Sequence, residues 1–85
     1  MTISTIDDLS SMPEVELRAL MARCGLDAIA FAVHGVDPAT KRRLIRALSP
    51  FRGLRLRAMR AYREAVPLAS VEAAHAAIVA EANRA

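Results

Sequence analysis

Apolar residues recur every three or four positions along nearly the whole chain, which is the spacing of one face of an α-helix. Prolines and glycines fall between these periodic stretches, where helix ends are expected. The pattern predicts five helices, over residues 13–24, 27–34, 38–48, 50–65 and 70–82. We therefore predict an all-α fold, a compact bundle of about five short helices joined by short loops, in a single domain over residues 1–85.

The predicted helices begin at residues that suit a helix N-terminus. Ser11 and Glu14 have the spacing of a capping box, in which each side chain satisfies the other residue's backbone N–H. Asp37 and Ser49 each precede a proline, which favours a capping side chain followed by proline at the first helical position.

Glycine and proline mark the predicted helix ends. Gly25 and Gly35 are expected to end helices in the left-handed conformation, and Pro67 to break the helix before it. Residues 1–10 are expected to be a lead-in segment, for which the pattern allows a short turn or a frayed end.

The predicted helices differ in how much of their surface is apolar. Residues 27–34 are apolar all round, so this helix is expected to be central. In the helix over 50–65 the predicted buried stripe is Phe51, Leu54, Ala58, Ala61 and Ala65. Leu56 and Met59 lie beside that stripe, and we expect them to form an exposed edge that a second copy or another partner covers.

The composition excludes several classes of protein. With one cysteine, the chain has no internal disulfide and no cysteine-based zinc module. Its longest wholly apolar run, residues 28–33, is far shorter than the roughly 20 residues of a membrane span, and no secretory leader is recognisable. These features predict a cytoplasmic protein that does not insert into membranes.

Residues that could carry catalysis are few and scattered. His34 and His75 fall in different predicted helices, and neither is next to an acid that would orient it. Cys24 lies on the apolar stripe of its helix, which favours a small buried side chain over a nucleophile. The glycines are isolated, so no phosphate-binding loop is present. We expect no enzyme activity, no cofactor and no metal site.

The net charge of +3 conceals a strongly polarised sequence. Residues 41–63, here called the basic block, contain nine basic side chains and no acid, whereas the rest of the chain carries three arginines against nine acids. Those nine are Lys41, Arg42, Arg43, Arg46, Arg52, Arg55, Arg57, Arg60 and Arg63. Because like charges on successive helices repel one another, the block predicts an acidic partner, or acidic residues elsewhere in the fold that cover it.

Nucleic acid is one acidic partner that the basic block could bind. The candidate contacts are Lys41, Arg42, Arg43 and Arg46, within a stretch that follows the outline of a helix-turn-helix. Two packing positions do not suit that motif, since Phe31 stands where a small residue is needed and Lys41 where an apolar one is needed. A small basic nucleic-acid-binding protein is therefore the alternative interpretation.

Motifs along the whole chain support a different partner class. An Ile-Asp-Asp-Leu lead-in is followed by a short apolar helix ending in glycine, a helix ending in Leu-Ser, and a helix beginning Val-Glu-Ala-Ala. These stretches are residues 6–9, 26–36, 44–49, 66–68, 71–74 and 78–79. Their order and spacing resemble the C-terminal domain of the flagellar motor switch protein FliG. The resemblance implies an armadillo-like superhelical arrangement, a place in the cytoplasmic switch ring, and a long charged helix that contacts the stator.

The charged positions of that family are not retained in this chain. The resemblance places His34 where the family has a lysine, and Phe51 where it has an arginine. Ala58 and Met59 fall on the family's adjacent acidic pair, and residues 64–67 on its Gly-Pro-Val-Arg stretch. A helix that carries cations alone is expected to hold an acidic face, whereas a helix of mixed sign can slide along it.

The leading interpretation is a non-enzymatic protein-interaction domain that resembles the flagellar switch domain without its torque residues. The candidate partner-binding residues are Arg52, Arg55, Arg57, Arg60 and Arg63, of which Arg55 or Arg57 is also suited to lie across the fold's own surface. The expected partner is an acidic surface of a switch-ring or stator component, at the cytoplasmic face of the flagellar basal body. We expect a stand-alone, divergent copy of the domain that could regulate a full-length partner.

Overall fold

Helices account for all the regular structure in the computed structural model, which describes residues 2–84. In chain order they are the 3-10 helix η1 (Ile6–Ser11), α1 (Glu14–Arg23), α2 (Leu26–Ala32), α3 (Pro38–Arg46), α4 (Pro50–Ala58), α5 (Arg60–Arg63) and α6 (Leu68–Ala82). The predicted all-α class is confirmed. There are more helices than predicted because the lead-in forms η1 and the expected helix over 50–65 is divided in two.

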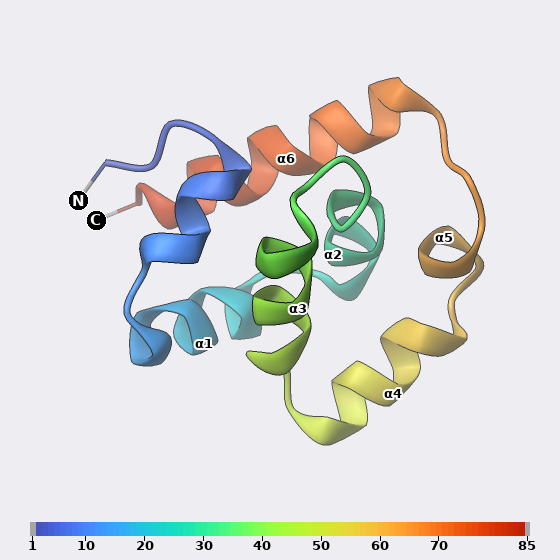
Figure 1. The fold of residues 1–85 in the computed structure, drawn as a ribbon, viewed down its shortest axis with the longest axis horizontal. Coiled ribbons are helices and arrows are strands. Elements are labelled where there is room, and N and C mark those ends of the chain that lie inside the picture. Colours follow the sequence, from blue (N-terminus) through green and yellow to red (C-terminus); the bar gives the residue numbers. More distant parts are fainter. Residues whose placement is uncertain (1, 85) are drawn as a thin grey trace.

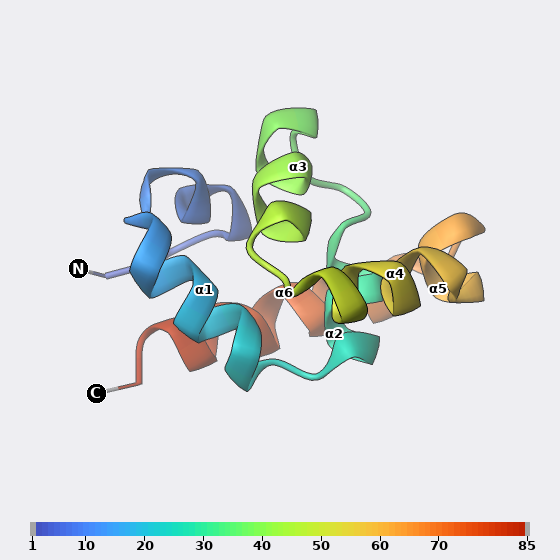
Figure 2. The same cartoon turned by 90° about the horizontal axis from the view of Figure 1, so that it is seen from below.

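The apolar helix α2 lies at the centre of the arrangement, as its sequence predicts. It packs against α6, which runs along one side of the molecule, and it also contacts α4 and α5 (Figure 1). Ile29, Ala30 and Ala32 of α2 are buried, and the small alanines allow the neighbouring helices to approach closely. The helices η1 and α1 lie at one end of the molecule and α4 and α5 at the other (Figure 2).

The lead-in segment is packed, so of the two predicted alternatives the short turn is confirmed, as η1, and the frayed end is wrong for residues 2–10. Ile3, Ile6 and Leu9 are buried in the core. The backbone N–H of Ile3 donates to Asn83 Oδ1 at 2.8 Å, and Asn83 Nδ2 donates to the carbonyl of Ile3 at 2.7 Å. This reciprocal pair joins the two ends of the chain, which lie side by side in Figure 1.

The start of η1 is stabilised by a carboxylate. Asp8 Oδ2 accepts hydrogen bonds from the backbone N–H groups of Ser4 at 2.9 Å and Thr5 at 3.0 Å. The bonds from Thr5 and Ser4 hold the pKa of the Asp8 carboxyl below its ordinary value, because they favour the ionised form.

The capping box predicted at Ser11 and Glu14 is wrong. The chain enters α1 through extended backbone at Pro13, which takes the capping position and makes no side-chain bond. Glu14 pairs instead with Arg18, one turn further along, with Oε1 and Nη2 separated by 2.8 Å. The predicted cap at Ser49 is confirmed, since its Oγ accepts the backbone N–H of Arg52 at 3.3 Å.

Gly35 ends α2 in the left-handed conformation, with a φ of 74°. The prediction that Gly25 does the same for α1 is wrong, because its φ is −66°. Gly25 instead occupies the residue before α2, which begins at Leu26. Among residues 2–84, Gly35 is therefore the position where the backbone conformation favours glycine over other residues.

We expect Gly35→Ala to lower the free energy of unfolding by about 1 kcal/mol, because an L side chain is strained at positive φ. The added Cβ would meet Val71 Cγ1 at 3.6 Å and His75 Cε1 at 3.7 Å, which are ordinary contacts, so the cost arises from the backbone. Gly53→Ala is the control, since Gly53 lies inside α4 and a Cβ added there would meet nothing within 4 Å. It should raise the free energy of unfolding by about 0.5 kcal/mol. If urea denaturation showed that both variants change the free energy of unfolding in the same direction, the special role of Gly35 would be contradicted.

The face of α4 that packs on the core differs from the predicted one. Phe51 and Leu54, predicted to be buried, are each 68% exposed. Leu56, predicted to lie on an exposed edge, is 0% exposed and contacts the core, while Met59 is partly buried. The helix is rotated so that Leu56 faces inward, and Leu56, which was expected to pair with a second copy or another partner, is covered by this chain's own core.

The predicted helix over 50–65 is interrupted at Met59, whose φ of −79° and ψ of 138° are those of extended backbone. The break allows the short helix α5 to turn toward α2, which it contacts. His34 Nε2 lies 2.6 Å from the carbonyl oxygen of Ala61 and donates to it, so a side chain at the end of α2 holds α5 in place.

The last helix, α6, begins at Leu68, two residues before the predicted start, and buries Val71, Ala74 and Ile78. The described helices include none that is both long enough and apolar enough to span a membrane.

Candidate functional site

The nine cations of the basic block lie on α3, α4 and α5, and the structure separates them into three groups. Two arginines are clamped by backbone carbonyls of the fold, four cations surround a groove between α3 and α4, and three arginines lie on the outer side of α4 and α5. The predicted covering by acidic residues does not occur within residues 2–84. There, the block's one salt bridge joins Arg60 Nε to Glu64 Oε2 at 2.8 Å.

Arg43 is the first of the clamped arginines. Its Nη1 donates to the carbonyl oxygens of Leu9 at 3.0 Å and Ser10 at 2.6 Å, and its Nη2 donates to the carbonyl of Met12. These carbonyls lie at and just after the end of η1, where few backbone donors remain, although Leu9 also accepts the N–H of Met12 at 3.1 Å. Arg43 therefore joins α3 to the end of η1 and the segment that leads into α1, and its guanidinium, a candidate nucleic-acid contact, is hydrogen-bonded within the fold.

Arg52 is the second clamped arginine. Its Nη1 donates to the carbonyl of Met21 at 2.7 Å, and its Nη2 donates to the carbonyl of Cys24 at 2.7 Å. These carbonyls lie at the C-terminal end of α1, where the helix dipole also favours a positive charge. The expectation that the Arg52 guanidinium faces solvent is therefore wrong, because it is hydrogen-bonded within the fold. Arg52 and Leu56 are one turn apart and lie on the same side of α4. The hydrogen bonds of Arg52 therefore help to fix the rotation of α4 about its axis.

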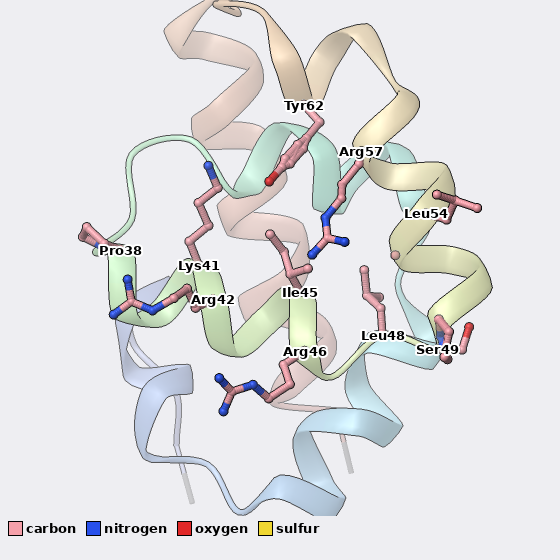
Figure 3. Close-up of a pocket in the computed structure, with 12 residues that line it drawn as sticks. Pro38, Lys41, Arg42, Ile45, Arg46, Leu48, Ser49, Leu54, Arg57 and Tyr62 are labelled. Atoms are coloured by element: carbon pink, nitrogen blue, oxygen red, sulfur yellow. The ribbon is translucent and has the colours of Figure 1, made fainter.

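A groove of about 890 Å³ lies between α3 and α4 and is drawn in Figure 3. Its apolar lining residues are Ile45 and Leu48, between the two helices, and Leu54 at the rim on α4 (Figure 3), and the absence of a side chain at Gly53 opens the groove further. Four cations also line the groove: Lys41, Arg42 and Arg46 from α3, and Arg57 from α4. In Figure 3 Arg57 extends from α4 toward α3 across the groove.

Tyr62 closes one end of this groove. It comes from α5 and reaches the groove only because the break at Met59 turns α5 toward α2 and α3. Lys41 Nζ lies 5.0 Å from the centroid of the Tyr62 ring, within the range of a cation–π contact. The groove is thus built from three helices, and its position depends on a break that the sequence pattern did not reveal.

The outer arginines are Arg55, Arg60 and Arg63, all exposed. The guanidinium of Arg55 lies 5.9 Å from the centroid of the Phe51 ring, one turn earlier in α4, so Arg55 partly covers that exposed aromatic side chain. The structure thus separates the predicted partner contacts: Arg57 enters the groove, Arg55 and the α5 arginines lie outside it, and Arg52 belongs to the fold.

The two histidines serve the interior of the fold. His75 Nε2 lies 2.8 Å from the carbonyl oxygen of Ala32 and 3.0 Å from that of His34, so it bonds the end of α2 to α6. His34, the position where the family resemblance places a lysine, turns inward to Ala61. Sequence reasoning missed both contacts, because the partners are carbonyls distant in the chain.

Cys24 and Glu81 are two further titratable side chains whose surroundings shift their pKa. Burial raises the pKa of the Cys24 thiol, and the nearby carboxylate of Glu81 raises it further, so the reactive thiolate is disfavoured. Hydrogen bonds from Arg23 and then Arg84 lower the pKa of Glu81 and keep it charged. The described residues contain no group of three or more His, Cys, Asp or Glu side chains that could hold a metal ion.

Comparison with protein families decides the relationship that the motifs suggested. The model of the FliG C-terminal domain matches residues 2–85, essentially the whole chain. The chain belongs to the FliG C-terminal domain family. The search of curated proteins and the search of solved structures each returned no match.

Membership of the FliG C-terminal domain family makes this chain a flagellar motor switch domain, and its all-helical structure agrees with that family. The structure also places His34 and Phe51, two positions where the sequence resemblance leads us to expect a charged residue in the family. His34 holds α5 against α2, and Phe51 is an exposed apolar side chain under Arg55. Four of the nine cations of the basic block line the groove between α3 and α4.

Proposed function

We propose that this flagellar switch domain is a non-enzymatic docking module that binds an acidic surface of another motor component through the cations of α3, α4 and α5. The observation that carries the proposal is that Lys41, Arg42, Arg46 and Arg57 all line one groove, Arg57 extending across it and Arg42 and Arg46 extending to the side of α3 away from α4 (Figure 3). No carboxylate in the described part of the chain pairs with any of these four. Their mutual repulsion is relieved when an acidic partner binds.

A surface of one sign favours a lasting contact over a sliding one. The family's torque helix carries charges of both signs, which can attract and repel a stator in turn as it passes. In this chain the basic block has no acid before Glu64, and Glu64 is paired with Arg60. We therefore propose that the domain holds or regulates a switch-ring or stator component at the cytoplasmic face of the basal body, and does not itself transmit torque.

The proposal predicts a salt-dependent interaction. Binding of switch-ring and stator cytoplasmic fragments, measured by calorimetry, should weaken steeply between low and physiological salt, where the Debye length is only about 8 Å. The double variant Arg46→Gln/Arg57→Gln should lower the affinity at low salt by about tenfold, because it removes two unpaired cations from the groove.

Arg18→Gln is the matched control for this experiment. Arg18 is an exposed arginine on α1 that is paired with Glu14, outside the basic block, and its replacement should leave the affinity within about twofold. Failure of every fragment to bind at low salt would overturn the docking proposal. Tighter binding of duplex DNA than of any fragment, with the steep salt dependence of counterion release, would favour the nucleic-acid interpretation over it.

A further inference from the structure

The groove between α3 and α4 combines an apolar lining with positive charges. A purely ionic contact would need only the charges. Its lining is apolar at Ile45, Leu48 and Leu54, and Leu54 is 68% exposed. Cations belong to both walls, with Lys41, Arg42 and Arg46 on α3 and Arg57 on α4. An apolar strip between two charged walls is the complement of a helix that has one apolar face and acidic flanks.

We propose that this groove binds one acidic amphipathic helix of a partner protein. The inference rests on the docking function proposed above and specifies the segment of the partner that is recognised. The apolar face of that helix covers Leu54 and its neighbours, and the acids on its two sides pair with Arg46 on one wall and Arg57 on the other.

The dimensions of the groove fit a short helix. Its walls, α3 and α4, each have nine residues, and nine residues of α-helix span about 14 Å, or two and a half turns. A helix of that length presents three or four apolar side chains at positions i, i+3, i+4 and i+7, enough to cover the apolar lining. A phosphate backbone would satisfy the cations and leave Ile45 and Leu54 in water, which favours a protein occupant over nucleic acid.

A second copy of this chain is a poor occupant. The apolar residues of α1 are directed into its own core at Leu17, Leu20 and Met21. Those of α6 are buried in the same way at Val71 and Ile78. Two apolar side chains of these helices are exposed, Val15 of α1 at 80%, between Glu14 and Glu16, and Leu68 of α6 at 70%. Each is a single side chain and not an apolar face, so a different protein is the better source of the complement.

The test uses a defined probe and two matched pairs of variants. The probe is a fluorescently labelled, lactam-stapled helix of about 14 residues, with Leu at positions i, i+3, i+4 and i+7 and Glu along both flanks. A second peptide has the same composition in a scrambled order, which keeps the charge and removes the apolar face. Affinities for the full chain are measured by fluorescence anisotropy at low salt, and amide chemical shifts locate the contact.

Leu54 and Phe51 form the first matched pair, because both are 68% exposed on α4 and only Leu54 lines the groove. Leu54→Ser should weaken binding of the amphipathic probe by about tenfold, and Phe51→Ser should change it by less than about twofold. Arg57 and Arg55 form the second pair, on the same helix inside and outside the groove. Arg57→Gln should weaken binding by about fivefold and Arg55→Gln by less than about twofold.

The outcomes separate this inference from the proposed function. Preference for the amphipathic probe over the scrambled one, with shifts in α3 and α4 and the expected order within both pairs, supports the groove as a helix site. Equal binding of both acidic peptides, or equal effects of Leu54→Ser and Phe51→Ser, overturns the helix site and leaves charge-based docking standing.

If neither peptide binds and the motor fragments also fail to bind, both proposals are wrong. Dimerisation of the free chain by light scattering that Leu54→Ser abolishes would assign the groove to a second copy and overturn the inference.

Discussion

Replacing Leu56 with alanine is expected to lower the free energy of unfolding by about 3 kcal/mol, whereas the same replacement at Leu54 should change it by less than about 0.5 kcal/mol. The two leucines are two positions apart in α4, yet Leu56 is 0% exposed and Leu54 is 68% exposed. Urea denaturation followed by circular dichroism measures both values. A loss of this size should lower the Tm of a domain of this length by about 15 °C.

The difference has a simple physical origin. Leu56 packs in the core with Leu44 and Ile29, and truncating it removes apolar contacts and leaves a cavity that the helices close only in part. Leu54 borders the open groove, where water already reaches most of its surface. Truncating it exposes little new apolar area and creates no cavity.

The reverse result would be equally informative. If Leu54→Ala were costly and Leu56→Ala mild, α4 would be rotated as its hydrophobic pattern predicts, with Phe51 and Leu54 inward. The groove would then lose its apolar lining, and the helix site inferred above would fail with it. Equal, small effects at both positions would mean that α4 does not pack stably on the core.

The sequence of α4 is compatible with two rotations, which explains the wrong prediction. Leucine and arginine alternate from Leu54 to Arg57, so apolar residues at helical spacing can be connected through Phe51 and Leu54 or through Gly53 and Leu56. The choice is made by Arg52, whose guanidinium bonds the end of α1 at Met21 and Cys24. That contact joins residues 31 and 28 positions apart, and no local pattern contains it.

The break at Met59 was unpredictable for a related reason. Neither glycine nor proline occurs between Leu54 and Pro67, so local preferences favour one continuous helix. The compensating contacts come from α2, where His34 donates to the carbonyl of Ala61, 27 residues away. A histidine at the end of a short helix looks like a surface residue until the helix that it holds is in place.

The parts of the molecule that were predictable are those that depend on local signals or on charge alone. The helical class, the central position of α2, the left-handed Gly35 and the cap at Ser49 all follow from residues within one or two turns. The family resemblance was visible because it depends on the order of such local motifs, and the match over residues 2–85 confirms it. The basic block was visible too, but which of its members bind the fold and which face the groove depends on tertiary contacts.

Arg43 is the cation whose replacement should be most costly. Arg43→Gln is expected to lower the free energy of unfolding by about 2 kcal/mol, because it deprives three carbonyl oxygens of a charged donor at once. The effect should be local as well as global. Amide hydrogen exchange should accelerate most in η1 and in the residues that lead into α1, which Arg43 joins to α3.

Two further variants separate the hydrogen bonds of Arg43 from its charge. Arg42→Gln removes a neighbouring cation that is exposed and lines the groove, so it should leave stability within about 0.5 kcal/mol and relieve some repulsion in the basic block. Arg43→Lys keeps the charge but replaces the planar fork with a single ammonium, which cannot reach carbonyls on both sides, so it should still lose about 1 kcal/mol. Wild-type stability in Arg43→Lys would show that charge alone suffices at this position. Equal losses in Arg42→Gln and Arg43→Gln would show that the carbonyl clamp contributes nothing beyond the net charge of the block.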